Sequence, residues 1–186
     1  MAEAATDSSR WDRRLQQRLG LLGHRNWIGV VDAAYPLQTS PGIEMIDTGA
    51  PATAVIQAVL AILGTALHVR PIAYTDFELG FVAEEDAVGV TAYRWDLEQL
   101  LAGVTRHRWL HEQIIARLSE AGKEFNILLL KTTLVIPYTS VFFELECGYW
   151  PAAAEVKLRA AMESGPDASH EGNSPPSSAE NAGKAL

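Results

Sequence analysis

The hydrophobic residues of this chain follow two spacings that alternate along the sequence. Short, nearly continuous apolar runs, such as residues 27–31 (Trp-Ile-Gly-Val-Val), are typical of strands covered on both faces. Apolar residues at helical spacing, as at Trp11, Leu15 and Leu19, predict amphipathic helices. Because strand and helix alternate repeatedly, the pattern predicts an α/β sandwich with a mostly parallel sheet.

The individual elements follow from these spacings and from the turn residues between them. We expect strands at residues 27–31, 43–47, 69–74, 125–130 and 140–145. We expect helices at residues 9–22, 51–63, 95–101 and 107–120, the last two ended by Gly103 and Gly122. Residues 75–94 are harder to interpret. The segments 82–83 and 88–93 could form strands or an excursion at the edge of the sheet, and both interpretations stay open.

The two ends of the chain differ from the rest in composition. Residues 1–8 are predicted to be a short flexible leader, without the charged-then-apolar order of a signal peptide. Residues 164–186 are rich in Ser, Gly, Pro and Asn, and such a composition cannot bury enough apolar surface to offset its ordering entropy. We therefore expect a disordered tail there and a single α/β domain over residues 9–163.

Charge and motif content exclude several classes of protein. The net charge is −8 and no dense Lys/Arg stripe is present, so nucleic acid and anionic membranes are poor candidates for partners. No apolar run approaches the roughly 20 residues of a membrane-spanning helix. The single cysteine, Cys147, rules out an intramolecular disulfide and a Cys-x-x-Cys metal site. Without a signal peptide or a spanning helix, we expect a cytoplasmic protein. No Gly-rich nucleotide-binding motif is present either, so we expect no cofactor and no metal.

Candidate site residues cluster where the strands should end. Open α/β sheets bind ligands outside the carboxyl ends of their strands, which selects Asp32 and the segment 131–140 with Tyr138. His24 precedes its strand, so it reaches that edge only if a loop reverses its position or if it serves a neighbouring subunit. The competing interpretations are structural: a helix C-terminal cap for His24, a turn cap for Asp32 and a packed corner for Tyr138.

Three blocks of sequence have a family pattern. In the first block, Gly23-His24 is followed by an apolar strand, by Asp32-Ala33 and then by Pro36. The second block, residues 43–51, ends in Gly-Ala-Pro. In the third, residues 137–140 read Pro-Tyr-Thr-Ser before the last strand. In these blocks the chain resembles the RbsD/FucU family of D-ribose pyranases and L-fucose mutarotases, over about residues 15–148. The resemblance implies an RbsD-like three-layer αβα sandwich.

The resemblance also implies a function and roles for five residues. His24 would be the catalytic acid/base, because an imidazole titrates near neutrality and can move a proton in either direction. Asp32, Tyr138, Ser140 and His111 would bind the sugar. The implied protein is a cofactor-independent isomerase of a monosaccharide, a mutarotase or pyranase, assembled as a homo-oligomeric ring in which adjacent subunits complete each site.

Two other functions remain open. Asn26, Leu134 and Ser140 replace an Asp, a Glu and an Asn of the family pattern, which favours a diverged, non-catalytic sugar-binding protein. The poor match of residues 75–125 favours a scaffolding oligomer without a ligand. Arg106 and His107 are alternatives to His111 as the further sugar-contacting residue.

Overall fold

A computed structural model of the chain describes residues 8–164, which fall into two compact units. The first unit ends at Tyr149 and contains every strand that the described residues form. The second begins at Trp150 and carries the helix α5 (Ala152–Ser164). The leader and tail predicted from the sequence lie outside the described residues, apart from Ser8 and Ser164, the terminal residues of α1 and α5.

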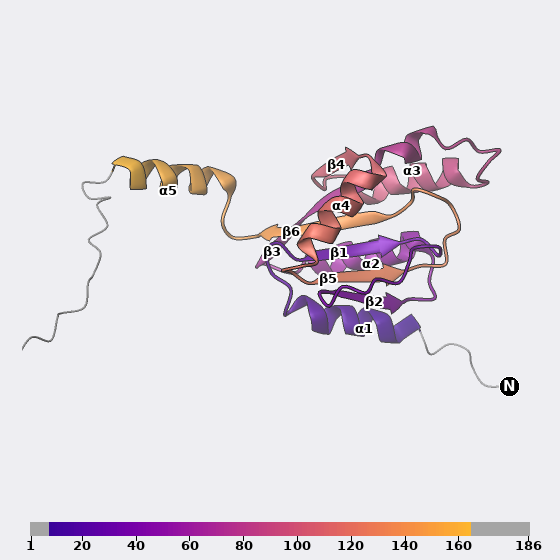
Figure 1. Ribbon diagram of the computed structural model, residues 1–186, viewed down its shortest axis with the longest axis horizontal. Coiled ribbons are helices and arrows are strands. Elements are labelled where there is room, and N and C mark those ends of the chain that lie inside the picture. Colours follow the sequence, from indigo (N-terminus) through magenta and orange to yellow (C-terminus); the bar gives the residue numbers. More distant parts are fainter. Residues whose placement is uncertain (1–7, 165–186) are drawn as a thin grey trace, which may run out of the picture. The chain divides into compact units, whose positions relative to one another are not determined.

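A six-stranded sheet forms the centre of the first unit (Figure 1). The strand order is β2-β5-β1-β6-β3-β4. The bounds are β1 Trp27–Val31, β2 Ile43–Asp47, β3 Val69–Asp76, β4 Arg106–Trp109, β5 Ile127–Lys131 and β6 Val141–Cys147. Pairings β1–β5, β2–β5 and β3–β4 are parallel, whereas β6 is antiparallel to both β1 and β3. The expected mostly parallel sheet is confirmed, with β6 as the one reversed strand.

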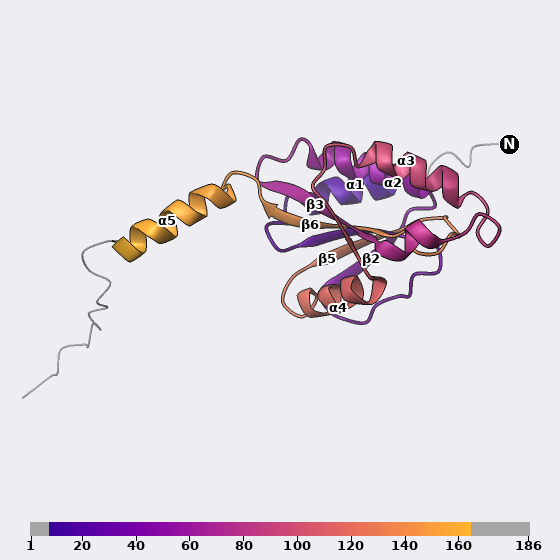
Figure 2. The same cartoon turned by 90° about the horizontal axis from the view of Figure 1, so that it is seen from above.

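Helices cover both faces of this sheet. Helices α1 (Ser8–Leu19), α2 (Ala52–Leu63) and α3 (Val90–Leu100) lie on one face, and α4 (His111–Ala121) lies on the other (Figure 2). Alternate strand residues point to opposite faces, so Val30 and Leu130 pack in one hydrophobic cluster and Leu129 and Phe142 in a second. The three-layer αβα architecture is therefore confirmed. Within residues 8–164, no helix has the length and apolarity needed to cross a membrane.

The helix predicted at residues 107–120 is wrong in its first part. Residues Arg106–Trp109 form β4, whose backbone pairs in parallel with the end of β3. A four-residue edge strand is too short to display a two-residue period, and its charged Arg and His side chains resemble a solvated helix face. The helix α4 begins only at His111. This correction moves His111 to the first turn of the helix, beside the carboxyl edge of the sheet.

The uncertain segment 75–94 contains a turn and the beginning of a helix. β3 extends to Asp76, and a 3-10 helix, η1 (Phe77–Phe81), follows. The strand alternative at 88–93 is wrong, because α3 already begins at Val90, five residues before the predicted start. The Glu84 carboxylate accepts the backbone N–H groups of Gly89 (2.6 Å) and Thr91 (2.9 Å), which caps α3 and lowers the pKa of Glu84 to about 2.

Candidate functional site

A cavity of about 380 Å³ opens at the carboxyl edge of the sheet, on the face covered by α4. Three segments that are distant in sequence form most of its walls: the loop after β1, one side of α4 from His111 to Ser119, and the loop that enters β6. Ile43, at the start of β2, also lines it. Its polar and aromatic lining residues include Asp32, Tyr35, His111, Ser119 and Tyr138. Three of the predicted site residues thus line one cavity within a single chain.

Asp32 and Ser140 form a hydrogen-bonded pair at one side of this cavity. The Asp32 Oδ1 atom accepts the backbone N–H of Ala34 at 2.8 Å, and Oδ2 accepts the Ser140 hydroxyl at 3.3 Å. Their proximity follows from the antiparallel register of β1 and β6, which sets Val30 opposite Val141. The residue that follows β1 therefore meets the residue that precedes β6.

Tyr138 is held in an unusual backbone conformation. Its φ is +59°, a left-handed value that bulky side chains rarely adopt. The conformation is fixed by the next residue, Thr139, whose hydroxyl donates to the Ile136 carbonyl (2.7 Å) and whose carbonyl accepts the Tyr93 hydroxyl (2.6 Å). Such strain costs roughly 1–3 kcal/mol and is concentrated at functional sites. Here it sets a 40 % exposed phenol at the mouth of the cavity.

His111 is fixed at the start of α4 by two carboxylates. Its backbone N–H donates to both oxygens of Glu78, at 3.0 Å each. Its ring atom Nδ1 lies 3.2 Å from Oδ1 of Asp76, and the Tyr138 ring stands edge-on to the imidazole with 5.7 Å between centroids. The side chain remains 32 % exposed, which leaves part of the ring open to the cavity.

Asp76 is a buried carboxylate that the sequence analysis did not select. It is the last residue of β3, its side chain has no exposed surface, and its Oδ2 atom has no hydrogen-bond partner. Burial raises the pKa of Asp76 from 3.8 to about 6, against the opposing influence of His111. The rule that selected Asp32, a polar residue at the carboxyl end of a strand, would have found Asp76 had the strand been extended past residue 74.

Tyr35 is a second lining residue that sequence reasoning missed. It packs against Phe142 with a centroid separation of 6.1 Å, and Lys131 Nζ donates to its backbone carbonyl at 3.0 Å. Burial, together with the nearby charges of Asp76 and Asp32, raises the pKa of the Tyr35 phenol to about 12. The phenol is therefore a neutral hydrogen-bonding group at physiological pH. Nothing in the local sequence distinguishes it from an ordinary loop tyrosine.

His24 lies at the other end of β1, away from the cavity. The five residues of the strand lie between it and Asp32, and at roughly 3.3 Å per residue they span about 16 Å. Its turn is closed by the Asn26 side chain, which accepts the Gly23 N–H at 2.7 Å, and by the Arg25 N–H, which donates to the Leu145 carbonyl at 2.8 Å. His24 is exposed there, and no loop brings it to the other predicted residues within the chain.

The alternatives to His111 lie elsewhere. Arg106 and His107 belong to β4, and neither lines this cavity. No cluster of histidine, cysteine or carboxylate side chains suited to a metal ion occurs in the described part of the chain. The donor set is thus one of carboxylates, phenols, a hydroxyl and an imidazole, which can bind a polyhydroxylated ligand and move protons.

Solved structures with a similar fold exist among known proteins. No family model matches the chain, and no curated protein matches it. Among solved structures it is similar to RbsD of Bacillus subtilis complexed with D-ribose, with a TM-score of 0.50 and 20% identity over 72% of this chain and 91% of that one. It also matches fucose mutarotase from Streptococcus pneumoniae in complex with L-fucose, with a TM-score of 0.45 and 17% identity over 78% and 98% of the two chains. The chain therefore has the RbsD-like fold expected from its sequence.

Proposed function

We propose that this protein binds a monosaccharide in the cavity beside Asp32, His111 and Tyr138 and interconverts its anomeric or ring forms. The observation that carries the proposal is the convergence of these groups, from three segments of the chain, on one cavity at the carboxyl edge of an RbsD-like sheet. The solved RbsD structure holds D-ribose.

The lining groups suit a ligand covered in hydroxyl groups. Asp32 has accepting capacity beyond its bonds to Ala34 and Ser140, since an ionised carboxylate can accept about four hydrogen bonds. The phenols of Tyr35 and Tyr138 can donate and accept, and their rings supply apolar surface for the C–H faces of a sugar. No part of this recognition requires a bound cofactor.

Opening a sugar ring requires two coordinated proton movements. A base removes the proton from the anomeric hydroxyl, the bond from the anomeric carbon to the ring oxygen breaks with its electron pair on that oxygen, and an acid protonates the oxygen. Rotation and closure by the reverse steps give the other anomer, and closure through a different hydroxyl gives the other ring size. The protons balance, so the site needs only groups that exchange protons near neutral pH.

His24 enters this proposal through a second copy of the chain. Within one chain it stands at the opposite end of β1 from the cavity. The ring assembly implied by the family resemblance offers a way to bring His24 of one copy to the Asp32, His111 and Tyr138 of another. We propose that arrangement, with His24 as one of the two proton-exchanging groups.

Saturation-transfer NMR of D-ribose and L-fucose tests the activity. We expect the wild-type protein to accelerate exchange between anomers, and His111→Ala to reduce the acceleration by about 10²-fold or more, because general acid–base groups contribute on that scale. His107→Ala, which removes an exposed histidine outside the cavity, is the matched control and should exchange at the wild-type rate. If the wild type neither accelerates exchange nor broadens the sugar signals, the proposal fails.

A non-catalytic sugar-binding protein is the alternative function. It is favoured by Ser140 and Asn26, which replace family residues and whose side chains are engaged in bonds within the protein, to Asp32 and to the Gly23 turn. Broadening of the sugar signals without anomer exchange would establish this alternative.

Mixing two inactive variants tests whether sites are completed between copies. His24→Ala and His111→Ala should each be inactive alone, but a mixture dissociated and reassembled should regain about a quarter of the wild-type rate, because random assembly pairs two intact residues at that frequency. Each variant reassembled with itself is the control. If the mixture stays inactive while the subunits do exchange, His24 does not act across an interface.

A further inference from the structure

We propose that Asp76 is a positioning residue that holds His111 with its proton on Nδ1, so that Nε2 of His111 is the second proton-exchanging atom of the site. This inference rests on the proposed function for its substrate. The arrangement of Asp76 and His111 is a property of the chain itself and can be tested without any sugar.

The geometry fixes His111 at two points, one on its backbone and one on its ring. Glu78 accepts the backbone N–H of His111 at 3.0 Å and anchors the first residue of α4. Asp76 Oδ1 lies 3.2 Å from Nδ1. Because an ionised carboxylate can only accept, Nδ1 must carry the hydrogen, and a neutral imidazole then has a free lone pair on Nε2. The tautomer is thus set by the carboxylate behind the ring.

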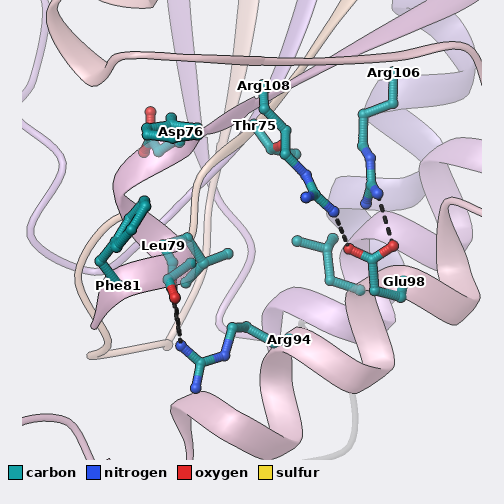
Figure 3. Close-up of a pocket in the computed structure, with 11 residues that line it drawn as sticks. Thr75, Asp76, Leu79, Phe81, Arg94, Glu98, Arg106 and Arg108 are labelled. Atoms are coloured by element: carbon teal, nitrogen blue, oxygen red, sulfur yellow. Dashed lines mark hydrogen bonds and ion pairs between the residues drawn. The ribbon is translucent and has the colours of Figure 1, made fainter. Parts of the chain in front are cut away.

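Asp76 has no other charged group to bond. Asp76 also contributes to the lining of a second cavity, of about 240 Å³, which three arginines line as well (Figure 3). Arg106 and Arg108 both donate to Glu98, at 2.7 Å each, and Arg94 donates to the carbonyls of Leu79, Gly80 and Val82. None of these arginines makes a hydrogen bond or ion pair with Asp76, so in the described part of the chain the carboxylate is bonded to His111 alone.

The surrounding charges favour a transient positive charge on His111. The ionisable groups near the Asp76–His111 pair include the carboxylates Glu78 and Asp32 and the phenols Tyr35, Tyr93 and Tyr138. The Glu112 carboxylate lines the same cavity as His111, and the three arginines that share the second cavity with Asp76 are bonded to other groups. No cation among the described residues is bonded to the pair. When Nε2 takes a proton from the sugar's anomeric hydroxyl, the imidazolium forms next to the buried Asp76 charge, and returning the proton from Nε2 restores the neutral ring.

The tautomer can be measured directly by NMR. In the ¹⁵N-labelled wild-type protein at pH 7.5, a two-bond ¹H–¹⁵N correlation spectrum should show His111 with a protonated Nδ1 and an unprotonated Nε2. The signal is assigned by its loss in His111→Gln. In Asp76→Ala the ring should change to the Nε2-protonated form. An Nε2-protonated ring in the wild type would overturn the inference, and this measurement holds even if a variant folds poorly.

The kinetic test separates positioning from a merely structural role. Asp76→Asn should slow anomer exchange by about 10²-fold with less than about a threefold change in sugar affinity, whereas a damaged cavity would lose affinity as well. In the wild type, exchange should decline below about pH 6, where Asp76 becomes protonated, and Asp76→Asn should lose that limb of the profile. Unchanged exchange in Asp76→Asn would overturn the inference. If the wild type turns over no sugar, the proposed function fails. The NMR measurement of the tautomer still tests whether Asp76 holds the proton of His111 on Nδ1.

Discussion

Replacing Phe142 with alanine should lower the free energy of unfolding by about 3–5 kcal/mol, the usual cost of removing a fully buried aromatic ring. Phe142 has no exposed surface and lies on β6 directly opposite Gly29 of β1. A side chain at Gly29 would come within 2.9 Å of the Phe142 ring and 2.6 Å of Leu129, so these two residues fill the space above the glycine backbone. The alanine variant would open a cavity in the middle of the sheet.

Denaturant unfolding measures this loss, with Phe81→Ala as the matched control. Phe81 is 73% exposed, so its replacement should change stability by no more than about 0.5 kcal/mol. Phe142 also packs against Tyr35, and its loss should therefore loosen one wall of the candidate site. A loss of less than about 1 kcal/mol in Phe142→Ala would contradict the packing described for this face of the sheet.

Asp76 should make the protein less stable as the pH rises from 4 to 7. Its pKa is about 6 in the folded chain against 3.8 as the ordinary value, so between these values the folded state binds more protons than the unfolded state. The favourable contribution is complete below about pH 4 and is lost as the pH rises through 6. A shift of about two units corresponds to about 3 kcal/mol. The stability of wild type relative to Asp76→Asn should fall by about that amount over this range.

Urea unfolding of both proteins at several pH values checks this expectation. Subtracting the free energy of unfolding of one protein from that of the other cancels the contributions of the other titrating groups. Any constant cost of the asparagine amide does not affect how this difference varies with pH. Asp86→Asn, the same change at an exposed turn, should give a difference that hardly varies with pH. A pH-independent difference for Asp76→Asn would mean that the carboxylate is not desolvated in the folded protein. A pH-dependent difference would also bear on function, because a buried charge that is kept at a cost to stability is typical of active sites.

Much of the fold could be predicted because its central strands are buried on both faces. Residues 27–31 were predicted with the bounds that the structure has, since a continuous apolar run in a central strand has few alternatives. Residues 43–47, which form the edge strand β2, also have the predicted bounds. β4 was missed because it is a four-residue edge strand of mostly polar residues, stabilised by backbone pairing to β3 that no local pattern reveals. The start of α3 was missed because its cap comes from Glu84, which sequence reading treats as solvated.

The candidate site was predictable to the extent that topology alone determines it. Asp32 and Ser140 meet because the end of β1 and the start of β6 share one edge of the sheet. The Asp76–His111 contact was not predictable, since it depends on where β3 ends and α4 begins, and element boundaries are the least reliable part of a sequence reading. For His24, the sequence left two possibilities open, and the structure removes the one that required a reversing loop within the chain.

The reversed direction of β6 has a consequence for how the site can change. Because β5, β1 and β6 are neighbours in that order, the connection from β5 to β6 crosses above the end of β1 and never leaves that edge. Its Leu134 carbonyl accepts the Ala33 N–H at 2.8 Å, which ties the connection to the Asp32 loop. Residues 132–140 thus form a connection that can be exchanged without altering the strands. Grafting a connection of different length or with different side chains would alter which ligands fit, while every strand pairing below it stays intact.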